Sequence, residues 1–294
     1  MISVLIPTRL RNEILERVLE GYACQTAAPE SFELVVVEDG PSGSARQIAL
    51  RAGARYIDGP HAPGPAGARN MGIEAAAGEI ILMTGDDMVP SPELVQRHLE
   101  AHRATPGGAI LGHVRWHPDC EVTPFMRHVS ERGGQFSFHR IADPERCSYR
   151  FFYTSNISLP TRWLLRERFD TDFATATTED VELGYRLHKR GLIIRYRPAA
   201  VVFHHHHLAI EDYCQRMERA GEAVSMFVSK HAGDPDPRRR LLPFSLVPGG
   251  TRTVVLATSL LAALPPGRLK WYGLVIGHYA RGAARAERQR PRRP

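Results

Sequence analysis

The sequence is poor in lysine, in paired cysteines and in long apolar runs. Of its 38 basic residues only three are lysine, Lys189, Lys230 and Lys270. The four cysteines lie far apart without a CxxC pair, which excludes a zinc-finger spacing and a dense disulfide framework. No apolar run reaches the ~18 residues of a membrane-spanning helix. The 294 residues therefore indicate a globular α/β protein with reduced, buried thiols.

The chain has little net charge outside its end. Residues 281–294 hold six arginines and one glutamate, so they account for five of the six formal positive charges. The remaining body is nearly neutral, and we expect no nucleic-acid partner. The first residues, Ile2 to Ile6, form a strand-like run without a charged leader, so no secretory signal is expected. We therefore expect a cytoplasmic protein, with the inner face of the membrane as a second location.

Strand-like and helical patterns alternate over the first ninety residues. Continuous apolar runs that alternate with helices are typical of parallel strands buried on both faces. The sequence therefore predicts a mostly parallel central sheet flanked by helices. The predicted strands are Ser3–Ile6, Leu34–Val37, Ala54–Ile57 and Glu79–Met83, with helices near 14–22, 45–51 and 66–77 between them.

The middle of the chain is less regular. It has strand-like runs at Ala109–Trp116, Tyr153–Pro160 and Ala199–His204, helices near 178–190 and 211–230, and a loop-rich stretch up to about 150. After residue 235 the composition changes, and we place a boundary there. The predicted main part, 1–235, has a first half (1–90) and a second half (108–235). Residues 236–294 are predicted to form a helical C-terminal extension with a basic tail.

Polar residues follow three of the predicted strands. They are Pro7-Thr8-Arg9, Glu38-Asp39-Gly40 and Thr84-Gly85-Asp86-Asp87. Ligands of open α/β sheets bind beyond the carboxyl ends of the strands. The adjacent carboxylates Asp86 and Asp87 suit Mg²⁺ or Mn²⁺ on a diphosphate, although a polar turn that caps the next helix explains them equally well. Asp39 is as ambiguous, because Asp-Gly is a common turn.

Three further motifs carry candidate chemistry. Arg69, near the start of a helix after Gly64 and Gly67, suits a phosphate, without a GxGxxG or P-loop pattern. Asp180 lies in a first helical turn, where it could be held ionised as a general base or serve only a capping box with Thr177. Strand alternation places His204 and His206 on one face of the four-histidine run 204–207, and at least one could bind a metal.

These motifs, in this order, resemble glycosyltransferase family 2, the inverting nucleotide-sugar-dependent enzymes of the GT-A fold. The resemblance runs from residue 2 to about 230. It implies that 1–235 is the catalytic part, with a nucleotide-sugar-binding half (1–90) and an acceptor half (108–235). Its motifs are Val4-Leu5-Ile6-Pro7-Thr8, Val36-Val37-Glu38-Asp39-Gly40, Gly67-Ala68-Arg69-Asn70-Met71-Gly72-Ile73, Gly85-Asp86-Asp87, Thr154-Ser155-Asn156-Ile157-Ser158-Leu159 and Glu179-Asp180-Val181-Glu182-Leu183-Gly184-Tyr185-Arg186-Leu187.

The resemblance implies roles for individual residues. It places Pro7, Thr8, Arg9, Glu38, Asp39, Arg69 and Asp86 at the donor, and Ser155 and Asn156 at the sugar or acceptor. It makes Asp180, with Glu179 beside it, the base of a single inverting displacement, and Asp86, Asp87, His204 and His206 the metal group for Mg²⁺ or Mn²⁺. The sequence departs from the family pattern at Arg9-Leu10, at Glu38 and at Thr84, which stands where an Asp is frequent.

Several alternatives stay open at this point. The donor is expected to be a UDP-sugar first, with GDP- or dTDP-sugars next, and the acceptor is a glycan, a lipid-linked molecule or a small molecule, as in bacterial polysaccharide biosynthesis. A nucleotidyltransferase-like enzyme and a non-catalytic nucleotide-sugar-binding scaffold are the competing functions. Within 240–294, the runs 254–264 and 271–280 either pack on the body or on another subunit, with a frayed tail, or touch a membrane surface.

Overall fold

The computed structural model describes residues 1–40, 42–59, 64–132, 134–173, 175, 177–246 and 249–289. The chain forms two compact units. The first comprises Met1–Val122 and Phe136–His207, and the second comprises Thr123–Gln135 and Leu208–Pro294. The second unit therefore begins well before residue 236, where the sequence placed the start of the extension. It includes the long helix α8 (Ile210–Lys230), which the sequence assigned to the catalytic part.

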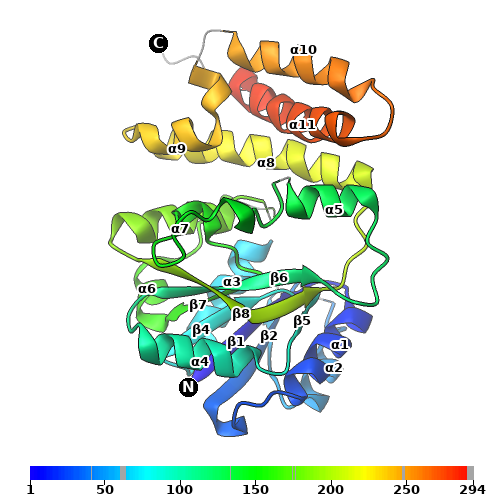
Figure 1. Ribbon diagram of the computed structural model, residues 1–294. Helices are drawn as coiled ribbons and strands as arrows, with labels where there is room; N and C mark the ends of the chain where they lie inside the picture. The colour runs from blue at the N-terminus through cyan, green and yellow to red at the C-terminus, as the bar shows by residue number, and fades with distance from the viewer. Residues whose placement is uncertain are drawn as a thin grey trace. The chain divides into compact units, whose positions relative to one another are not determined.

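The first unit is built around an eight-stranded sheet in the order β3-β2-β1-β4-β7-β6-β8-β5 (Figure 1). The strands β1, β2, β3 and β4 pair in parallel, as do β6 and β8. The strands β7 and β5 run antiparallel to their neighbours. The prediction of a mostly parallel central sheet is confirmed. The bounds are β1 Ile2–Thr8, β2 Phe32–Asp39, β3 Arg55–Gly59, β4 Ile80–Thr84, β5 Met88–Pro90, β6 Ala109–Trp116, β7 Asn156–Pro160 and β8 Ile194–His204.

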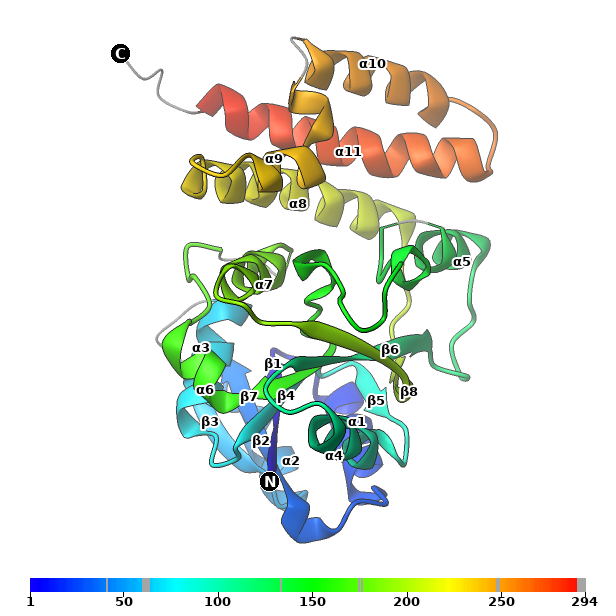
Figure 2. The ribbon, with the colours of Figure 1, turned by 60° about the vertical axis from the view of Figure 1, so that its left-hand side comes forward.

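Helices cover both faces of this sheet (Figures 1 and 2). Successive side chains of a strand point to opposite faces, so Val4 and Ile6 enter one core and Leu5 enters the other. Apolar residues dominate both cores, which is why the strands read as continuous apolar runs. One face is covered by α1 (Asn12–Ala23), α2 (Arg46–Arg51) and α4 (Leu94–Ala104), the other by α3 (Pro65–Ala75), α6 (Thr161–Arg166) and α7 (Glu179–Lys189).

The second unit is helical, and its helices approach one another closely through glycine. A Cβ on Gly282 of α11 (Arg268–Gln289) would lie 1.9 Å from the carbonyl oxygen of Glu218 on α8. Figure 1 shows α11 between α8 and α10 (Gly250–Ala262). This unit also contains α5 (Pro124–Glu131), α9 (Pro235–Leu241) and a 3-10 turn at Pro243–Leu246. The first unit has 3-10 turns at Pro29–Ser31, Phe138–Arg140 and Tyr149–Phe151.

Two details differ from the sequence-based expectation. The stretch read as loop up to residue 150 contains α5, whose first turn is capped by the Thr123 hydroxyl, which accepts from the Met126 N–H at 3.2 Å. The expected frayed tail is helical as far as Gln289, because Gly282 and Ala283 are buried in α11. Residues 290–294 of that tail lie outside the described residues. Within the described part, no helix is long and apolar enough to cross a bilayer.

Candidate active site at the carboxyl ends of the strands

The ends of β1 and β4 bring three of the predicted residues together. These strands pair in parallel, so their carboxyl ends meet at one edge of the sheet. The Thr8 hydroxyl donates to Asp86 Oδ2 at 2.8 Å. Arg11, at the start of α1, places Nη1 at 2.8 Å from Asp87 Oδ2 and at 3.4 Å from Asp86 Oδ1. A single guanidinium therefore faces two adjacent carboxylates.

The two carboxylates have different electrostatic environments. Burial and the neighbouring Asp87 charge raise the pKa of Asp86 to about 6, although Arg11 and Thr8 act in the opposite direction. Burial also disfavours the charge on Asp87, but the hydrogen bond and charge of His204, together with Arg11, hold the pKa of Asp87 well below its usual range. Paired acids whose pKa values are driven apart are typical of functional sites.

His204 completes this group from the end of β8. Its Nε2 lies 3.4 Å from Asp87 Oδ2. Its ring stacks on Trp116 at 5.0 Å and on His206 at 5.5 Å between centroids, so His204 and His206 do share a face. The pairing of β5 with β8 fixes this proximity, because the His205 N–H donates to the Asp87 carbonyl at 2.8 Å. His204 Nδ1 is buried and lacks a hydrogen-bond partner among the described residues.

These side chains fit a divalent cation. The carboxylates of Asp86 and Asp87 are the oxygen donors that Mg²⁺ and Mn²⁺ prefer, and the imidazole of His204 is an accepted partner for Mn²⁺. Arg11 supplies a positive charge between the same two carboxylates. A metal at this position would therefore compete with Arg11 for Asp87.

The end of β2 contributes a second polar group. Asp39 Oδ1 accepts from the Gly64 N–H at 3.0 Å, and Arg9 Nη1 lies 4.0 Å from the other oxygen of Asp39. Glu38 points into the fold, where Ala45 N–H (3.2 Å) and Tyr56 OH (2.7 Å) donate to it. Burial opposes ionisation of Glu38, but these bonds and those from Ser42 and Ser44 lower its pKa. Glu38 thus holds the turn before α2.

The start of α7 forms the third group. Arg69 of α3 donates from Nη1 to Glu179 Oε1 at 2.8 Å, and its guanidinium lies over the Phe169 ring at 5.4 Å. Glu179 Oε2 accepts from the backbone N–H groups of Thr177 and Thr178, at 2.8 and 3.0 Å. The alternative of a capping box between Thr177 and Asp180 is therefore wrong, because no side chain caps the start of α7 and Glu179 accepts from the N–H groups just before the helix.

Asp180 is left without an ion-pair partner of its own among the described side chains. Its Oδ1 accepts from the Val181 N–H at 2.7 Å. Burial, and then the negative charge of Glu179, raise the pKa of Asp180 well above its usual range, despite Arg69 and the N–H groups of Val181 and Thr154. The helix start was expected to hold this carboxylate ionised, but burial and Glu179 favour its protonated form instead. A raised pKa makes Asp180 a better base near neutral pH.

Two strained residues border the site. In the described part of the chain, Leu10 (φ 54°) and Phe136 (φ 51°) are the non-glycine residues with a left-handed backbone. Leu10 lies between Arg9 and Arg11, and the Phe136 ring meets His204 edge-on at 6.1 Å. Such conformations cost about 1 kcal/mol or more and gather at functional sites. The two strained residues therefore lie next to the charged side chains of the candidate site.

The family model described as glycosyl transferase family 2 matches residues 3–169. The chain belongs to this family. Among curated proteins, it is 32% identical over 220 residues to a validoxylamine A glucosyltransferase from Streptomyces hygroscopicus subsp. limoneus, covering 65% of this chain and 49% of the relative. It is 23% identical over 275 residues to a pre-mycofactocin glycosyltransferase from Mycobacterium tuberculosis, covering 91% and 57%. The chain spans about half the length of these curated relatives.

Solved structures show the same fold. The mannosyltransferase PcManGT from Pyrobaculum calidifontis, in complex with GDP-Man and Mn²⁺, has a TM-score of 0.69 at 16% identity and covers 97% of this chain and 86% of its own. TarS 1-349 from S. aureus, in complex with UDP, has a TM-score of 0.57 at 15% identity, with coverage of 99% and 93%. The GT-A fold predicted for this family member is confirmed.

One predicted site residue of this family member lies in the sheet interior instead. Asn156 on β7 is fully buried. Its Nδ2 donates to the carbonyls of His113 and Ala200, both at 3.0 Å, and its Oδ1 lies 2.9 Å from His98 Nε2. Because these hydrogen bonds engage its buried amide, Asn156 is not positioned to contact an acceptor substrate. The neighbouring Ser155 has a buried Oγ without a partner among the described residues.

Arg11 and Trp116 were missed by the sequence reasoning. Arg11 follows the motif Pro7-Thr8 by three residues, and Trp116 ends β6 beside His204 in register. The signal was available, because both residues stand just at or beyond the carboxyl end of a strand, like the residues that were found. Pro7 is half-buried near the end of β1, and Arg9 beside it is exposed.

His205 points into a different group from His204. His117, Asp119 and His205 have ligand atoms within 4.8 Å of one another. Arg17 already occupies this group, since its Nη1 lies 2.9 Å from His205 Nε2 and 3.0 Å from Asp119 Oδ2. In the described part of the chain, this second candidate metal group lies beside that of Asp86, Asp87 and His204, and an arginine contacts each of them.

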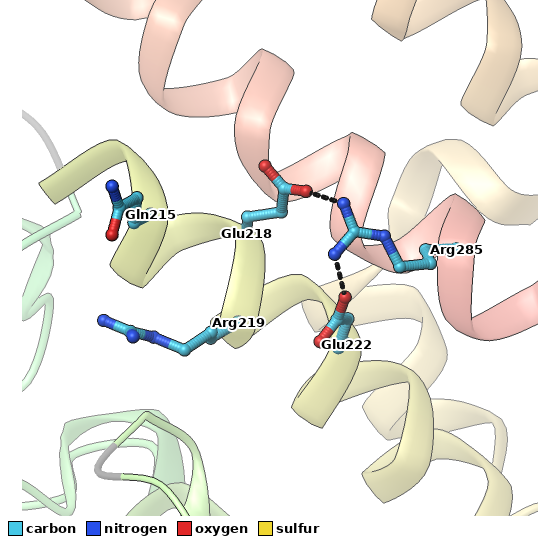
Figure 3. Close-up of a pocket in the computed structure, with 5 residues that line it drawn as sticks. All are labelled: Gln215, Glu218, Arg219, Glu222 and Arg285. Atoms are coloured by element: carbon cyan, nitrogen blue, oxygen red, sulfur yellow. Dashed lines mark hydrogen bonds and ion pairs between the residues drawn. The ribbon is translucent and has the colours of Figure 1, made fainter. Parts of the chain in front are cut away.

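The second unit has a polar hollow of about 260 Å³ (Figure 3). Arg285 of α11 pairs there with Glu222 at 2.8 Å and also with Glu218, both on α8. Its lining, Gln215, Glu218, Arg219, Glu222 and Arg285, consists of charges that largely neutralise one another. It contains none of the predicted site residues.

Proposed function

We propose that this chain transfers a sugar from a nucleotide-diphosphate sugar to an acceptor hydroxyl, with inversion at the anomeric carbon. Membership of glycosyl transferase family 2 supports transfer of a sugar. The observation that carries the proposal is the convergence of Asp86, Asp87 and His204 at one sheet edge, in a fold whose relatives were solved with GDP-Man or UDP.

Different charged residues would contact the nucleotide and the metal. Asp39, whose Oδ1 already accepts from the Gly64 N–H, would accept from the nucleobase, and Thr8 and Asp86 would contact the ribose. Asp87 and His204, with Asp86, would hold Mg²⁺ or Mn²⁺, which when bound neutralises the charge on the departing diphosphate. Arg11 would turn from Asp87 towards phosphate, because a bound cation replaces its charge at that carboxylate.

Asp180 would act as the general base. Its raised pKa suits proton removal from a hydroxyl near neutral pH. Glu179, which accepts from Arg69 and from two backbone N–H groups, would orient the first turn of α7 beside Asp180. Removal of the acceptor proton as the hydroxyl attacks opposite the nucleotide gives a single displacement, and one displacement inverts the configuration.

The test is a donor screen on the full chain. Melting temperatures are measured with UDP-, GDP- and dTDP-sugars, with and without Mn²⁺, because a ligand that binds the folded state raises stability. A rise for one nucleotide that needs Mn²⁺, followed by release of that nucleoside diphosphate, supports transfer. Nucleotide-sugar binding without hydrolysis or transfer to any acceptor would instead support the scaffold alternative.

A further inference from the structure

The C-terminal half of the second unit has an unusual charge distribution. Between Asp236 and Glu287 the sequence contains no acidic residue, whereas it contains seven arginines and one lysine. The helix α10 and the first two turns of α11 lie within this interval. Any polar surface that they present is therefore positive or neutral.

The helix α10 packs on α11 through small residues. Thr258 is buried, and a Cβ on Gly273 would lie 2.8 Å from its carbonyl oxygen and 2.6 Å from Leu261 Cβ. A Cβ on Gly277 would lie 2.9 Å from Thr258 Oγ1. The close approach uses Thr258 and Leu261 of α10, and the leucines Leu256 and Leu260 are not part of it.

Those apolar residues point outward. Leu256 and Leu260 are 70% and 76% exposed, and Leu264 follows at the same spacing of four residues. Leu269 (61%) and Tyr272 (52%) continue the apolar surface at the start of α11. Together these five side chains, here called the leucine face, are half of the ten large apolar side chains that are exposed in the described residues. Such a concentration marks an interaction surface.

Cations border the leucine face. Arg252 lies one helical turn before Leu256, and Arg268 directly precedes Leu269, and both are exposed. An apolar stripe with basic neighbours and without acidic ones is the pattern of helices that lie in the interface of an anionic membrane. With 13 residues, α10 is too short to cross a bilayer but long enough to lie on one.

We propose that the leucine face docks on an anionic lipid surface. The charge distribution selects this occupant over a second copy of the chain, because two such faces would bring Arg252 and Arg268 of both copies together without a carboxylate between them. Leu256 and Leu260 enter the acyl boundary, while the arginines contact the phosphates of the headgroups. The docking holds the second unit at the membrane surface.

The test is co-sedimentation of the full chain with vesicles. Vesicles of phosphatidylcholine are compared with vesicles that contain about 30% phosphatidylglycerol. We expect the parent chain to bind the anionic vesicles. Leu256→Ser/Leu260→Ser should weaken this binding at least about tenfold, since it removes two leucines that the membrane would bury. The matched control is Leu50→Ser/Leu165→Ser, which replaces leucines that are 51% and 55% exposed in the first unit and should leave binding unchanged.

A second variant tests the charges. Arg252→Gln/Arg268→Gln should weaken binding to the anionic vesicles by about tenfold, because each cation near such a surface contributes. Circular dichroism confirms that each variant folds. Failure of the parent chain to bind anionic vesicles overturns the proposal, as does undiminished binding by the double-serine variant. A dimer in sedimentation velocity that this variant dissociates, without vesicle binding, would assign the face to a second copy.

Discussion

Two buried polar groups of the first unit differ in how completely they are satisfied. In the interior of the sheet, His98 lies 2.7 Å from Ser158 Oγ and 2.9 Å from Asn156 Oδ1, and His102 shares the same hydroxyl at 2.7 Å. These groups are neutral, and their donors and acceptors match. Such a network adds stability and specifies packing.

At the carboxyl ends of the strands, by contrast, like charges crowd together. Asp86 and Asp87 share Arg11, Asp180 lies beside Glu179, and His204 Nδ1 has no partner among the described residues. The charged group at the strand ends therefore lowers the stability of the fold, whereas the interior network does not. The comparison teaches that crowded like charges beside an unpartnered histidine nitrogen, and not burial of polar residues alone, distinguish the candidate site.

The largest expected effect is on catalysis at the strand ends. Asp180→Asn should reduce sugar transfer by about a thousandfold or more, because the amide cannot take up the acceptor proton. Nucleotide affinity should change by less than about threefold. Transfer rate and calorimetric affinity are measured side by side. The matched control is Asp212→Asn, which changes an exposed first-turn carboxylate of α8. Near-normal transfer by Asp180→Asn would refute Asp180 as the base.

The next effect is on stability, in the sheet interior. Asn156→Ala should lower the free energy of unfolding by about 3 kcal/mol, because it leaves two carbonyls and His98 without partners. The melting temperature should fall by several degrees, whereas nucleotide affinity at low temperature should be retained. An unchanged melting temperature together with lost sugar transfer would instead assign Asn156 to the acceptor site. The difference drawn here between the interior network and the strand-end group would then be wrong.

A smaller effect separates the two metal-capable groups. Asp87→Ala should weaken Mn²⁺-dependent nucleotide binding by about a hundredfold, because it removes the carboxylate nearest to His204. Asp119→Ala, in the group with His117 and His205, should leave that binding unchanged. Calorimetry with and without Mn²⁺ measures both. The reverse pattern would move the metal to the second group.

The smallest effect is a pH dependence of the interior group. Burial lowers the pKa of His98 to about 4, so between about pH 6.5 and 4 the unfolded chain takes up a proton that the folded chain does not. Stability should therefore fall as pH drops through this range, and His98 alone should contribute about 2 kcal/mol of that fall at pH 5. Melting curves at pH 7 and 5 test this. His98→Asn should reduce the difference, and the exposed control His139→Asn should not.

The sequence alone determined the parts of the molecule that rest on local pattern. Continuous apolar runs such as Ser3–Ile6 and Leu34–Val37 identified buried strands, and the polar residues that follow them identified one edge of the sheet. Asp86 and Asp87 could be named because they follow a strand whose carboxyl end lies at the edge of the sheet where ligands bind. His204 was chosen from the four histidines through the family resemblance. The family and its GT-A fold followed from the order of these motifs.

Only the tertiary structure decided which partners each side chain meets. Arg11 lies within hydrogen-bond distance of Asp86 and Asp87. Glu179 accepts from the backbone N–H groups just before α7, while burial and the Glu179 charge raise the pKa of Asp180. Asn156, within a motif that resembles an acceptor site, is tied to strands β6 and β8. Hydrogen-bond satisfaction and charge crowding depend on groups distant in sequence, so periodicity and composition carry no record of them.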